Sequence, residues 1–555
     1  MKTKAIKTAI FILSLIYMFP DFGFCQSKIL GKWEGKFMND FKTILEIDQS
    51  NNKGYVGKII MFSGNDIIQN DPISNIRIEQ NTVSFRIEAK ETDFKGELNA
   101  KDTELKGVFI FPDQSEHPIH LTKNALESSA AEVEPKSFRE LKHHKYSVEE
   151  LQQDYHFLLD KIREYHPQLY SCISKKDFEI LVRNTEAKIN TEFTLSEFFI
   201  LISPVVESIK CSHTGIRLPS DYESLNQQNG NYLPFEVFFD GQKFYYLKSI
   251  ESCDTNLIPG DEIVSINQLP VSEIKNLLYS FIPVEGQNKS TKIYQINQNF
   301  NSIFNLIDDS NQFQIVTLRN GKIIKSTVQA CALNKPGITK KEKNRIPLNF
   351  YIDKKINLGI LEINSFMFGD INQYIQEMDG IFKTLQTENV NQLLIDLRGN
   401  QGGHPIFAAQ LLSYLVDSDF VYFKRNEDVP DFEPLYNPMQ ASTIRFDGNV
   451  FVWLDGGCLS TSGHLISLIK YHTPAVFIGQ KPGSTYRCND LSIKKTLPNT
   501  KIEVNIPRTT FETAVADYFE SHPFEVDFII EYSIIDLLSG RDLYLDFLKS
   551  NLLQP

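Results

Sequence analysis

The sequence has 555 residues, of which 41% are hydrophobic and 23% charged, and its formal net charge is −13. A folded chain of this length exceeds what a single hydrophobic core supports, so we expect two to four domains. The acidic charge is spread along the chain without a basic block, which argues against a nucleic-acid partner.

Residues 1–25 have the pattern of a secretory signal peptide. Three lysines lie within 1–7, an almost unbroken apolar run covers 9–19, and Gly23 and Cys25 are small residues where a signal peptidase reads the chain. No later stretch approaches 18 apolar residues. We therefore expect an exported protein, periplasmic or extracellular, with cleavage near Cys25 and no membrane span in the mature chain. A lipoprotein acylated at Cys25 is the second interpretation, and Gly23-Phe24 fits it poorly.

The cysteines beyond the signal segment have neither zinc-site spacing nor a disulfide framework. They are scattered, and we expect mostly buried free thiols among Cys172, Cys211, Cys253, Cys331, Cys458 and Cys488.

Residues 26–123 alternate between apolar and polar side chains in short runs separated by turn signals such as Asn51-Asn52-Lys53-Gly54. A period of two with regular turns predicts an antiparallel sheet that closes as a small barrel or forms a sandwich, and we expect the barrel. The opening residues 30–35, L-G-K-W-E-G, resemble the first strand of lipocalin-like barrels. The small and polar residues of 124–145 predict a linker.

Residues 146–225 change to helical periodicity. Ser147 and Glu150 have the spacing of a capping box, and Thr194 with Glu197 repeats it before a later helix. We expect a helical segment that ends at Ser212-His213-Thr214-Gly215.

Residues 230–335 return to strands and contain L-I-P-G-D-E-I-V-S-I-N at 257–267. This stretch resembles the signature of PDZ domains. Such a domain offers a sheet edge to which a peptide adds as an extra strand.

Residues 345–550 alternate strands with helices, which predicts a parallel or mixed α/β sheet. Buried strands are expected at 392–396 and 449–454, with a helix starting near 460. Ligands of such sheets bind at the carboxyl ends of the strands. The whole chain is therefore expected to be a multidomain α+β protein.

Two glycine-rich turns in this region could carry chemistry. Gly402 and Gly403 end the run D-L-R-G-N-Q-G-G and could direct N–H groups at an oxyanion. The run D-G-G-C-L-S-T-S-G-H at 455–464 offers Ser460 at a helix start and Cys458 two residues earlier. Without a further observation, a plain turn and a helix cap explain both equally well.

A serine nucleophile needs a base, and local spacing does not select one. Four of the eleven histidines lie in the same α/β region, and one lies far upstream: His404, His464, His472, His522 and His213.

The order of these motifs resembles the tail-specific and tricorn-type serine peptidases, which share a core with interphotoreceptor retinoid-binding protein. The resemblance covers about residues 147–548 and rests on P-G-D-E-I-V-S-I-N and D-L-R-G-N-Q-G-G in this order. It implies a crotonase-like core and makes Ser460 the nucleophile. The tail-specific branch uses a lysine about 25 residues later, where this chain has Thr485; Lys481 lies at the wrong offset.

The tricorn branch instead implies His213 as base, oriented by Ser212 and an acidic residue that aligns with Glu520. Glu525 and Asp517 stay open as alternatives to Glu520. The implied oxyanion donors are the N–H groups of Gly403 and Thr461, with Gly402 as a further candidate. One departure is Gly463, which replaces the glutamate of the family's S-A-S-E element.

The resemblance implies a serine peptidase that acts on peptides or protein C-termini through an acyl-enzyme, without a metal or cofactor. A catalytically inactive relative that binds peptides or apolar ligands in the same groove is the alternative, since a fold does not guarantee its chemistry. An esterase-like hydrolase would need the same residues.

Overall fold

The structure is a computed structural model that describes residues 29–37, 41–49, 55–63, 66–79, 81–87, 92–99, 101, 103–111, 116–123, 138–250, 256–333, 346–427 and 429–553. They belong to two compact units, Met1–Pro135 and Lys136–Pro555. The expected signal peptide, Cys25 and Cys253 lie outside the described residues. No helix among the described residues has the length and apolar character needed to cross a membrane.

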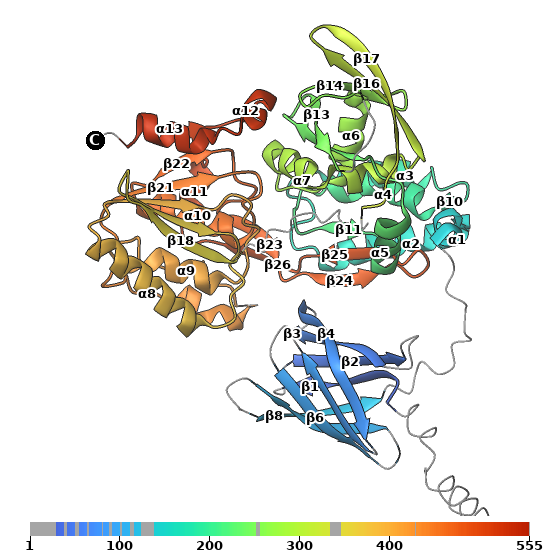
Figure 1. Cartoon of the computed structure of the whole chain (residues 1–555), viewed down its shortest axis with the longest axis horizontal. Coiled ribbons are helices and arrows are strands. Elements are labelled where there is room, and N and C mark those ends of the chain that lie inside the picture. Colours follow the sequence, from blue (N-terminus) through green and yellow to red (C-terminus); the bar gives the residue numbers. More distant parts are fainter. Residues whose placement is uncertain are drawn as a thin grey trace, which may run out of the picture. The chain divides into compact units, whose positions relative to one another are not determined.

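The first unit is a closed barrel of eight antiparallel strands, drawn in blue in Figure 1. Each strand pairs with the next along the chain, and β1 closes the barrel by pairing with β8. This confirms the predicted antiparallel barrel. The strands are β1 (Gly31–Phe37), β2 (Phe41–Gln49), β3 (Tyr55–Ser63), β4 (Asp66–Glu79), β5 (Thr82–Ile87), β6 (Thr92–Leu98), β7 (Glu104–Ile110) and β8 (Glu116–Lys123).

Apolar side chains pack inside this barrel, as the alternating sequence pattern requires. In β5, Val83, Phe85 and Ile87 are buried while their neighbours are not. Trp33 is fully buried and donates its Nε1–H to the Ile29 carbonyl at 2.8 Å. The unit therefore has a hydrophobic core of its own.

The second unit begins with helices and very short strands. Both predicted capping boxes are present, at Ser147 with Glu150 and at Thr194 with Glu197. The predicted linker is too long, because residues 138–146 form α1 and β9. The elements are α1 (Phe138–His143), β9 (Lys145–Tyr146), α2 (Val148–Tyr165), α3 (Lys175–Glu186), β10 (Phe193–Thr194), α4 (Leu195–Glu207), β11 (Gly215–Arg217) and α5 (Ser220–Asn229).

The segment expected to be PDZ-like forms an antiparallel sheet in the order β12-β13-β14-β16-β17, with β15 pairing to β14. Two helices pack into its core. The PDZ assignment itself stays a prediction. The elements are β12 (Phe235–Phe239), β13 (Phe244–Ser249), β14 (Glu262–Ile266), β15 (Leu269–Pro270), α6 (Val271–Phe281), α7 (Lys289–Ile307), β16 (Gln312–Arg319) and β17 (Lys322–Gln329).

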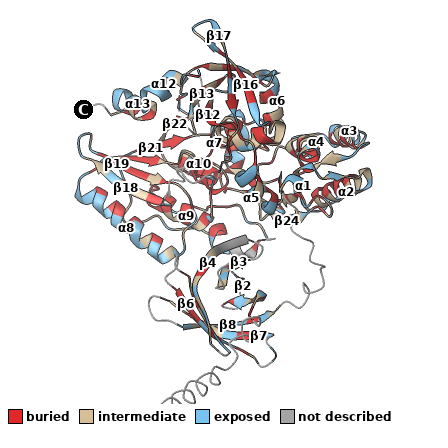
Figure 2. Cartoon of the chain, turned by 45° about the vertical axis from the view of Figure 1, so that its right-hand side comes forward, coloured by how far each residue is buried: buried red, intermediate tan, exposed pale blue. Residues whose placement is uncertain are grey.

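The third part is a mixed sheet in the order β18-β19-β20-β21-β22-β27, in which only the β18–β19 pair is antiparallel. Figure 2 shows its central strands β19 to β22 and helix α10 as mainly buried, whereas α8 exposes one face. The strands predicted at 392–396 and 449–454 have these bounds. The elements are β18 (Leu348–Asp353), β19 (Leu358–Ile363), α8 (Ile371–Thr387), β20 (Gln392–Asp396), α9 (Pro405–Ser413), η3 (Pro430–Tyr436), β21 (Asn449–Leu454), α10 (Thr461–His472), β22 (Val476–Gly479) and β27 (Phe528–Ile529).

Residues 487–512 leave this sheet, which the alternation of strands and helices did not predict. Strands β24 (Ile493–Thr496) and β25 (Glu503–Ile506) pair with each other, and β25 pairs with β11 (Figure 1). Their apolar side chains, including Leu497 and Ile502, join the core of the helical segment. The remaining elements are β23 (Arg487–Asp490), β26 (Thr509–Glu512), α11 (Ala516–Ser521), α12 (Ile534–Ser539) and α13 (Leu543–Asn551).

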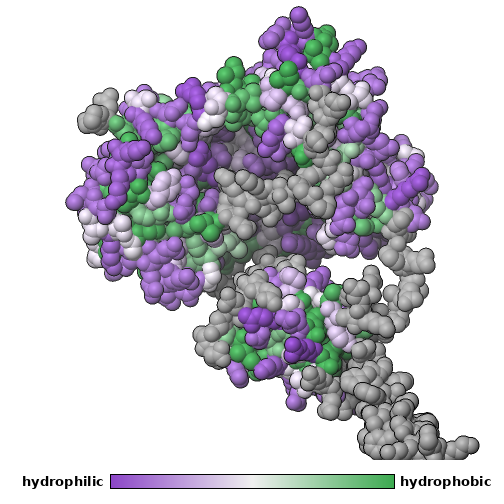
Figure 3. Space-filling model, in the orientation of Figure 1, coloured by the Kyte–Doolittle hydropathy of each residue, from purple (hydrophilic) through white to green (hydrophobic). Residues whose placement is uncertain are grey.

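Hydrophilic side chains cover much of the face of the second unit that Figure 3 shows, with apolar side chains in separate patches. This agrees with the acidic net charge of −13.

Candidate active site

Ser460 lies between strand β21 and helix α10, at the carboxyl end of the parallel strands. Its backbone has φ 52° and ψ −125°, a combination that residues with a side chain rarely adopt. Such strain costs about 1–3 kcal/mol and persists only where surrounding contacts enforce it. Its side chain makes no capping hydrogen bond. Ser460 therefore does more than begin a helix, and its strained strand-to-helix turn is of the kind that presents a nucleophile.

The turn before Ser460 is held by the Asp455 carboxylate. Asp455 Oδ1 accepts hydrogen bonds from the N–H groups of Gly399 and Gly457, both at 2.8 Å. Burial nevertheless raises the pKa of Asp455. Gly456 and Gly457 are required because a Cβ there would lie 2.2 Å from the Ser290 carbonyl and 2.5 Å from the Tyr294 ring. The first turns of α7 thus pack directly on this turn.

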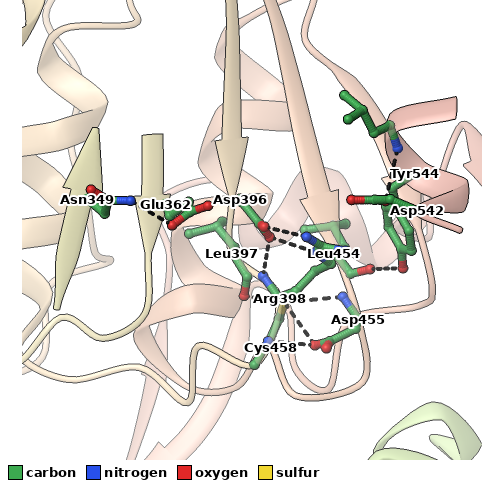
Figure 4. A network of polar contacts seen from close by, with 12 residues as sticks. Asn349, Glu362, Asp396, Leu397, Arg398, Leu454, Asp455, Cys458, Asp542 and Tyr544 are labelled. Carbon is green, nitrogen blue, oxygen red and sulfur yellow. Dashed lines mark hydrogen bonds and ion pairs between the residues drawn. The ribbon is translucent and has the colours of Figure 1, made fainter. Parts of the chain in front are cut away.

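The D-L-R part of the neighbouring turn has a structural role. Figure 4 shows Arg398 beside Asp396, with which it forms a two-point ion pair at 2.9 and 2.6 Å. Its guanidinium also lies 4.5 Å from the Trp453 ring and 4.7 Å from the Tyr544 ring. Tyr544 in turn donates a hydrogen bond to the Leu454 carbonyl at 2.9 Å. These contacts join the ends of β20 and β21 to helix α13.

Gly402 and Gly403 approach the Ser460 turn, but only one of them offers a free N–H. The Gly402 N–H donates to Asn400 Oδ1 at 2.8 Å, so the predicted use of Gly402 as an oxyanion donor is corrected. Its contribution is steric, because a Cβ on Gly402 would lie 2.9 Å from Ser460 Cβ. Among the described residues, no acceptor pairs with the N–H of Gly403 or Thr461. The Thr461 hydroxyl donates to the Gly403 carbonyl and ties these two donors together.

Cys458 does not compete with Ser460 as a nucleophile. It is fully buried, and its Sγ lies 3.1 Å from the Leu397 carbonyl. Burial, reinforced by the Asp455 carboxylate, raises the pKa of this thiol well above its ordinary value. A reactive cysteine needs an accessible thiolate, and this environment opposes one. Cys172, Cys211, Cys458 and Cys488 are free thiols, and of these four only Cys172 is exposed.

Ser212 and His213 follow helix α4 and precede β11. Ser212 Oγ donates to Glu285 Oε1 at 2.7 Å and lies 3.2 Å from His213 Nδ1. Because the hydroxyl has a single proton, which goes to Glu285, its oxygen accepts from the Nδ1–H of His213. This arrangement selects the neutral tautomer with a free lone pair on Nε2, the form a general base requires.

The pairing of β11 with β25 fixes His213 from the other side. Asn505 of β25 donates its Nδ2–H to the His213 carbonyl at 2.7 Å. The strands that leave the mixed sheet therefore help to position a residue that lies nearly 300 positions earlier in the sequence.

The carboxylate that contacts Ser212 is Glu285, whereas the predicted Glu520 has another partner. Glu520 forms an ion pair with Arg487 at 2.7 Å, and its side chain is 51% exposed. Asp517 pairs with Lys424, and Glu525 is exposed. None of these carboxylates has a hydrogen bond to Ser212 or His213 within the described part of the chain. Glu285 lies 73 residues from Ser212, between α6 and α7, and no local motif marks it.

A second carboxylate, Asp490 at the end of β23, approaches both the serine and the histidine. Its Oδ2 is 3.5 Å from Ser460 Oγ and 3.6 Å from His213 Nε2. In the described residues, no hydrogen bond joins Ser460 directly to His213. The structure thus brings Ser460, His213, Ser212 and Glu285 to one site, with Asp490 as a member that sequence reasoning missed.

The side chains of the other candidate histidines have no hydrogen bond to Ser460 among the described residues. His464 is fully buried beside Cys488 Sγ at 3.3 Å, and burial lowers its pKa to about 3. His404 accepts the Ile406 N–H at a helix start, and His522 stacks on Tyr518. Burial lowers the pKa values of His404 and His472 as well.

Lys481 is exposed and has no hydrogen bond to Ser460 among the described residues. In the same part of the chain, no cluster of three or more histidine, cysteine or acidic side chains could hold a metal ion.

Comparison with known proteins finds a family match for the part of the chain that contains Ser460 and Asp490. Residues 357–504 match the model of peptidase family S41. The chain carries a peptidase family S41 domain. The match runs from β19 to β25 and includes the Ser460 turn and Asp490, and it confirms the resemblance to the tail-specific and tricorn-type peptidases. The family is one of peptidases, which are hydrolases. No curated protein is a significant match for the chain.

Solved structures extend the likeness of fold beyond the S41 domain. Mature CPAF complexed with lactacystin matches with a TM-score of 0.51 and 12% identity, over 72% of this chain and 97% of that chain. Mature CPAF alone matches with the same TM-score and identity, over 72% and 96%. A photosystem II D1 C-terminal processing protease matches with a TM-score of 0.33 and 14% identity, over 65% and 88%.

One departure from the family pattern in the S41 domain has a steric cause. Gly463 replaces the family's glutamate, and a Cβ at this position would lie 2.4 Å from Ser484 Oγ and 2.6 Å from the Ser484 carbonyl oxygen. No larger residue fits against this backbone, so glutamate is excluded here without any consequence for Ser460.

Proposed function

We propose that this chain is an exported serine peptidase that hydrolyses peptide bonds, on peptides or at protein C-termini, through an acyl-enzyme on Ser460. The observation that carries the proposal is that the strained Ser460 and His213 Nε2 both lie within 3.6 Å of Asp490 Oδ2, while the other nitrogen of His213 is held by Ser212 and Glu285. The S41 domain supports the reaction class. The PDZ-like sheet would present an edge strand to an extended substrate.

In the proposed first step, His213 Nε2 accepts the proton of Ser460 Oγ as this oxygen attacks the substrate carbonyl carbon. The Asp490 carboxylate must move aside, since it lies within 3.6 Å of both atoms. Ser212 and Glu285 hold the imidazolium that forms. The oxyanion accepts hydrogen bonds from Gly403 N–H and Thr461 N–H, at the start of α10, whose dipole also favours negative charge.

In the second step, His213 gives its proton to the leaving nitrogen as the peptide C–N bond breaks. Water then attacks the acyl ester while His213 accepts its proton, and the serine leaves with that proton restored. The chain's own residues supply every proton transfer in this sequence.

The alternative is a relative that binds peptides or apolar ligands without cleaving them. The contact of Asp490 with both residues is the observation that favours it, because no hydrogen bond among the described residues joins Ser460 to His213.

Hydrolysis of an unstructured protein by the full chain separates the two functions. We expect new peptide termini with the parent chain and a loss of at least about a thousandfold in Ser460→Ala and His213→Ala, as for other triad residues. Retained binding without cleavage in the parent chain would establish the alternative.

The acidic partner is tested by a matched pair of variants. Glu285→Gln should lower kcat by about tenfold or more, because the Ser212–His213 pair loses its carboxylate. Glu520→Gln should change kcat by less than about twofold, since Glu520 is half exposed and paired with Arg487. The opposite order would return the role to Glu520.

A further inference from the structure

Asp490 is the one site carboxylate without a close partner in the described residues. Glu285 accepts both the N–H and the hydroxyl of Ser212, at 3.0 and 2.7 Å. The contacts of Asp490 to Ser460 and His213, at 3.5 and 3.6 Å, are much longer than the about 2.7–2.9 Å of a strong charge-assisted hydrogen bond. In the tautomer that Ser212 selects, Nε2 of neutral His213 has no proton to donate to Asp490. The Asp490 side chain is therefore weakly held.

The basic residues around Asp490 are engaged elsewhere. Arg508, which directly precedes Thr509, the cross-strand partner of Asp490 on β26, donates its Nε–H to the Leu491 carbonyl at 3.1 Å. Arg487, which lies on β23 together with Asp490, pairs with Glu512 and Glu520. Within the described residues, His213 is the only basic side chain within ion-pair distance of Asp490. A negative charge thus lies near Ser460, and no lysine or arginine in the described part of the chain neutralises it.

The position of Asp490 also makes it reachable from solvent. Its side chain is 40% exposed, against 20% for His213, while Ser460 is 7% exposed. A group entering from solvent toward Ser460 therefore meets the Asp490 carboxylate first. A cationic group would gain an ion pair there, whereas an apolar or acidic group would leave the carboxylate desolvated or repelled.

We propose that Asp490 is a specificity-determining gate, which selects substrates with a lysine or arginine side chain next to the scissile bond. The substrate cation pairs with the carboxylate and draws it away from the line between Ser460 Oγ and His213 Nε2. The serine and histidine then meet, so a basic substrate is favoured both in binding and in the alignment of the two residues. This proposal rests on the proposed peptidase function and specifies its substrate class.

Matched fluorogenic peptides test the selection. Each pair has lysine or norleucine on one side of the cleavage site, so that only the ammonium group differs in charge. With the full chain we expect kcat/KM to be about tenfold higher for the lysine peptide of at least one pair, and Asp490→Asn should reduce this ratio to below about twofold. Asp447→Asn, which removes one charge from a side chain that is 74% exposed, should keep the ratio of the parent chain.

A neutral fluorophosphonate probe tests the gate separately. Labelling of Asp490→Ala should be faster than labelling of the parent chain, because the interposed carboxylate is gone. Labelling of this variant as slow as that of Ser460→Ala would show that Asp490 activates the serine, and would overturn the gate.

A parent chain that is labelled but shows no lysine preference, or a preference that survives Asp490→Asn, would overturn the substrate selection alone. A parent chain that is neither labelled nor active on any peptide would overturn the peptidase function, and this inference with it.

Discussion

At the residue scale, two glycines of the S41 domain show how differently one substitution can act. Gly402 has φ +101°, and a Cβ there would lie 2.9 Å from Ser460 Cβ and 3.0 Å from Thr461 N. Gly380 lies inside helix α8, where a Cβ meets nothing within 4 Å. Gly402 is thus required for the packing of the Ser460 turn, whereas the space around Gly380 accommodates a side chain.

Gly402→Ala should lower the free energy of unfolding by about 1–3 kcal/mol and slow fluorophosphonate labelling by more than about tenfold. Gly380→Ala should raise the free energy of unfolding by about 0.5–1 kcal/mol and leave labelling unchanged. Urea denaturation and labelling rates measure both effects. Equal labelling rates in the two variants would contradict the close approach of Gly402 to Ser460.

His464 makes a second residue-scale prediction, about stability in acid. Burial lowers its pKa to about 3, while the unfolded chain has an ordinary value of about 6.5. Between these pH values the unfolded chain binds a proton at His464 that the folded chain does not bind. The contribution of this histidine to the free energy of unfolding is therefore fully present above about pH 6.5 and is lost as the pH falls toward 3. One such group contributes a slope of about 1.4 kcal/mol per pH unit.

His464→Gln should therefore reduce the slope of the free energy of unfolding against pH between pH 4 and 6 by the amount that corresponds to about one bound proton. The slope is informative even if the variant is less stable overall. His522→Gln, at an exposed position, is the control and should keep the slope of the parent chain. An unaltered slope in the His464 variant would show that this histidine is not held neutral by burial.

At the element scale, the sequence predicted what local patterns encode. The capping boxes at Ser147 and Thr194 and the buried strands 392–396 and 449–454 depend on residues close together in the chain, and all are present. Strands β24 and β25 leave the mixed sheet because they pack on helices some 300 residues earlier in the chain. The local pattern of apolar and polar residues does not encode such long-range contacts. Glu285 and Asp490 were not predicted for the same reason, because tertiary packing and not a local motif brings each of them to the site.

The pairing of β11 with β25 connects the strands that leave the mixed sheet to His213 of the candidate site. Asn505→Ala removes the hydrogen bond to the His213 carbonyl and should slow labelling of Ser460 by about three- to tenfold, while the free energy of unfolding falls by only about 1 kcal/mol. Lys494→Ala, at the exposed position opposite Asn505 on β24, is the control. If both variants are labelled at the parent rate, Asn505 does not position His213.

At the scale of the whole molecule, the chain consists of two compact units with separate cores. The barrel core contains residues 29–121 only, whereas the cores around the site contain none of these residues. Each unit therefore has a hydrophobic core of its own, and the sequence of the first unit alone predicted its antiparallel strands.

A chain truncated to residues 136–555 should therefore fold and be labelled within about twofold of the full-length rate. Calorimetry of the full chain should show a transition that the truncated chain lacks. A truncated chain that folds, by circular dichroism, but is not labelled would show that the barrel contributes to the site.

The central claim is that Ser460, and no neighbouring side chain, is the nucleophile of this S41 domain. Peptide mapping by mass spectrometry after fluorophosphonate labelling of the full chain tests it most directly. The account predicts the adduct on Ser460 alone, with none on Cys458 or Ser462, and no adduct in His213→Ala. An adduct on another residue of this turn, or one that forms equally well without His213, would contradict the account.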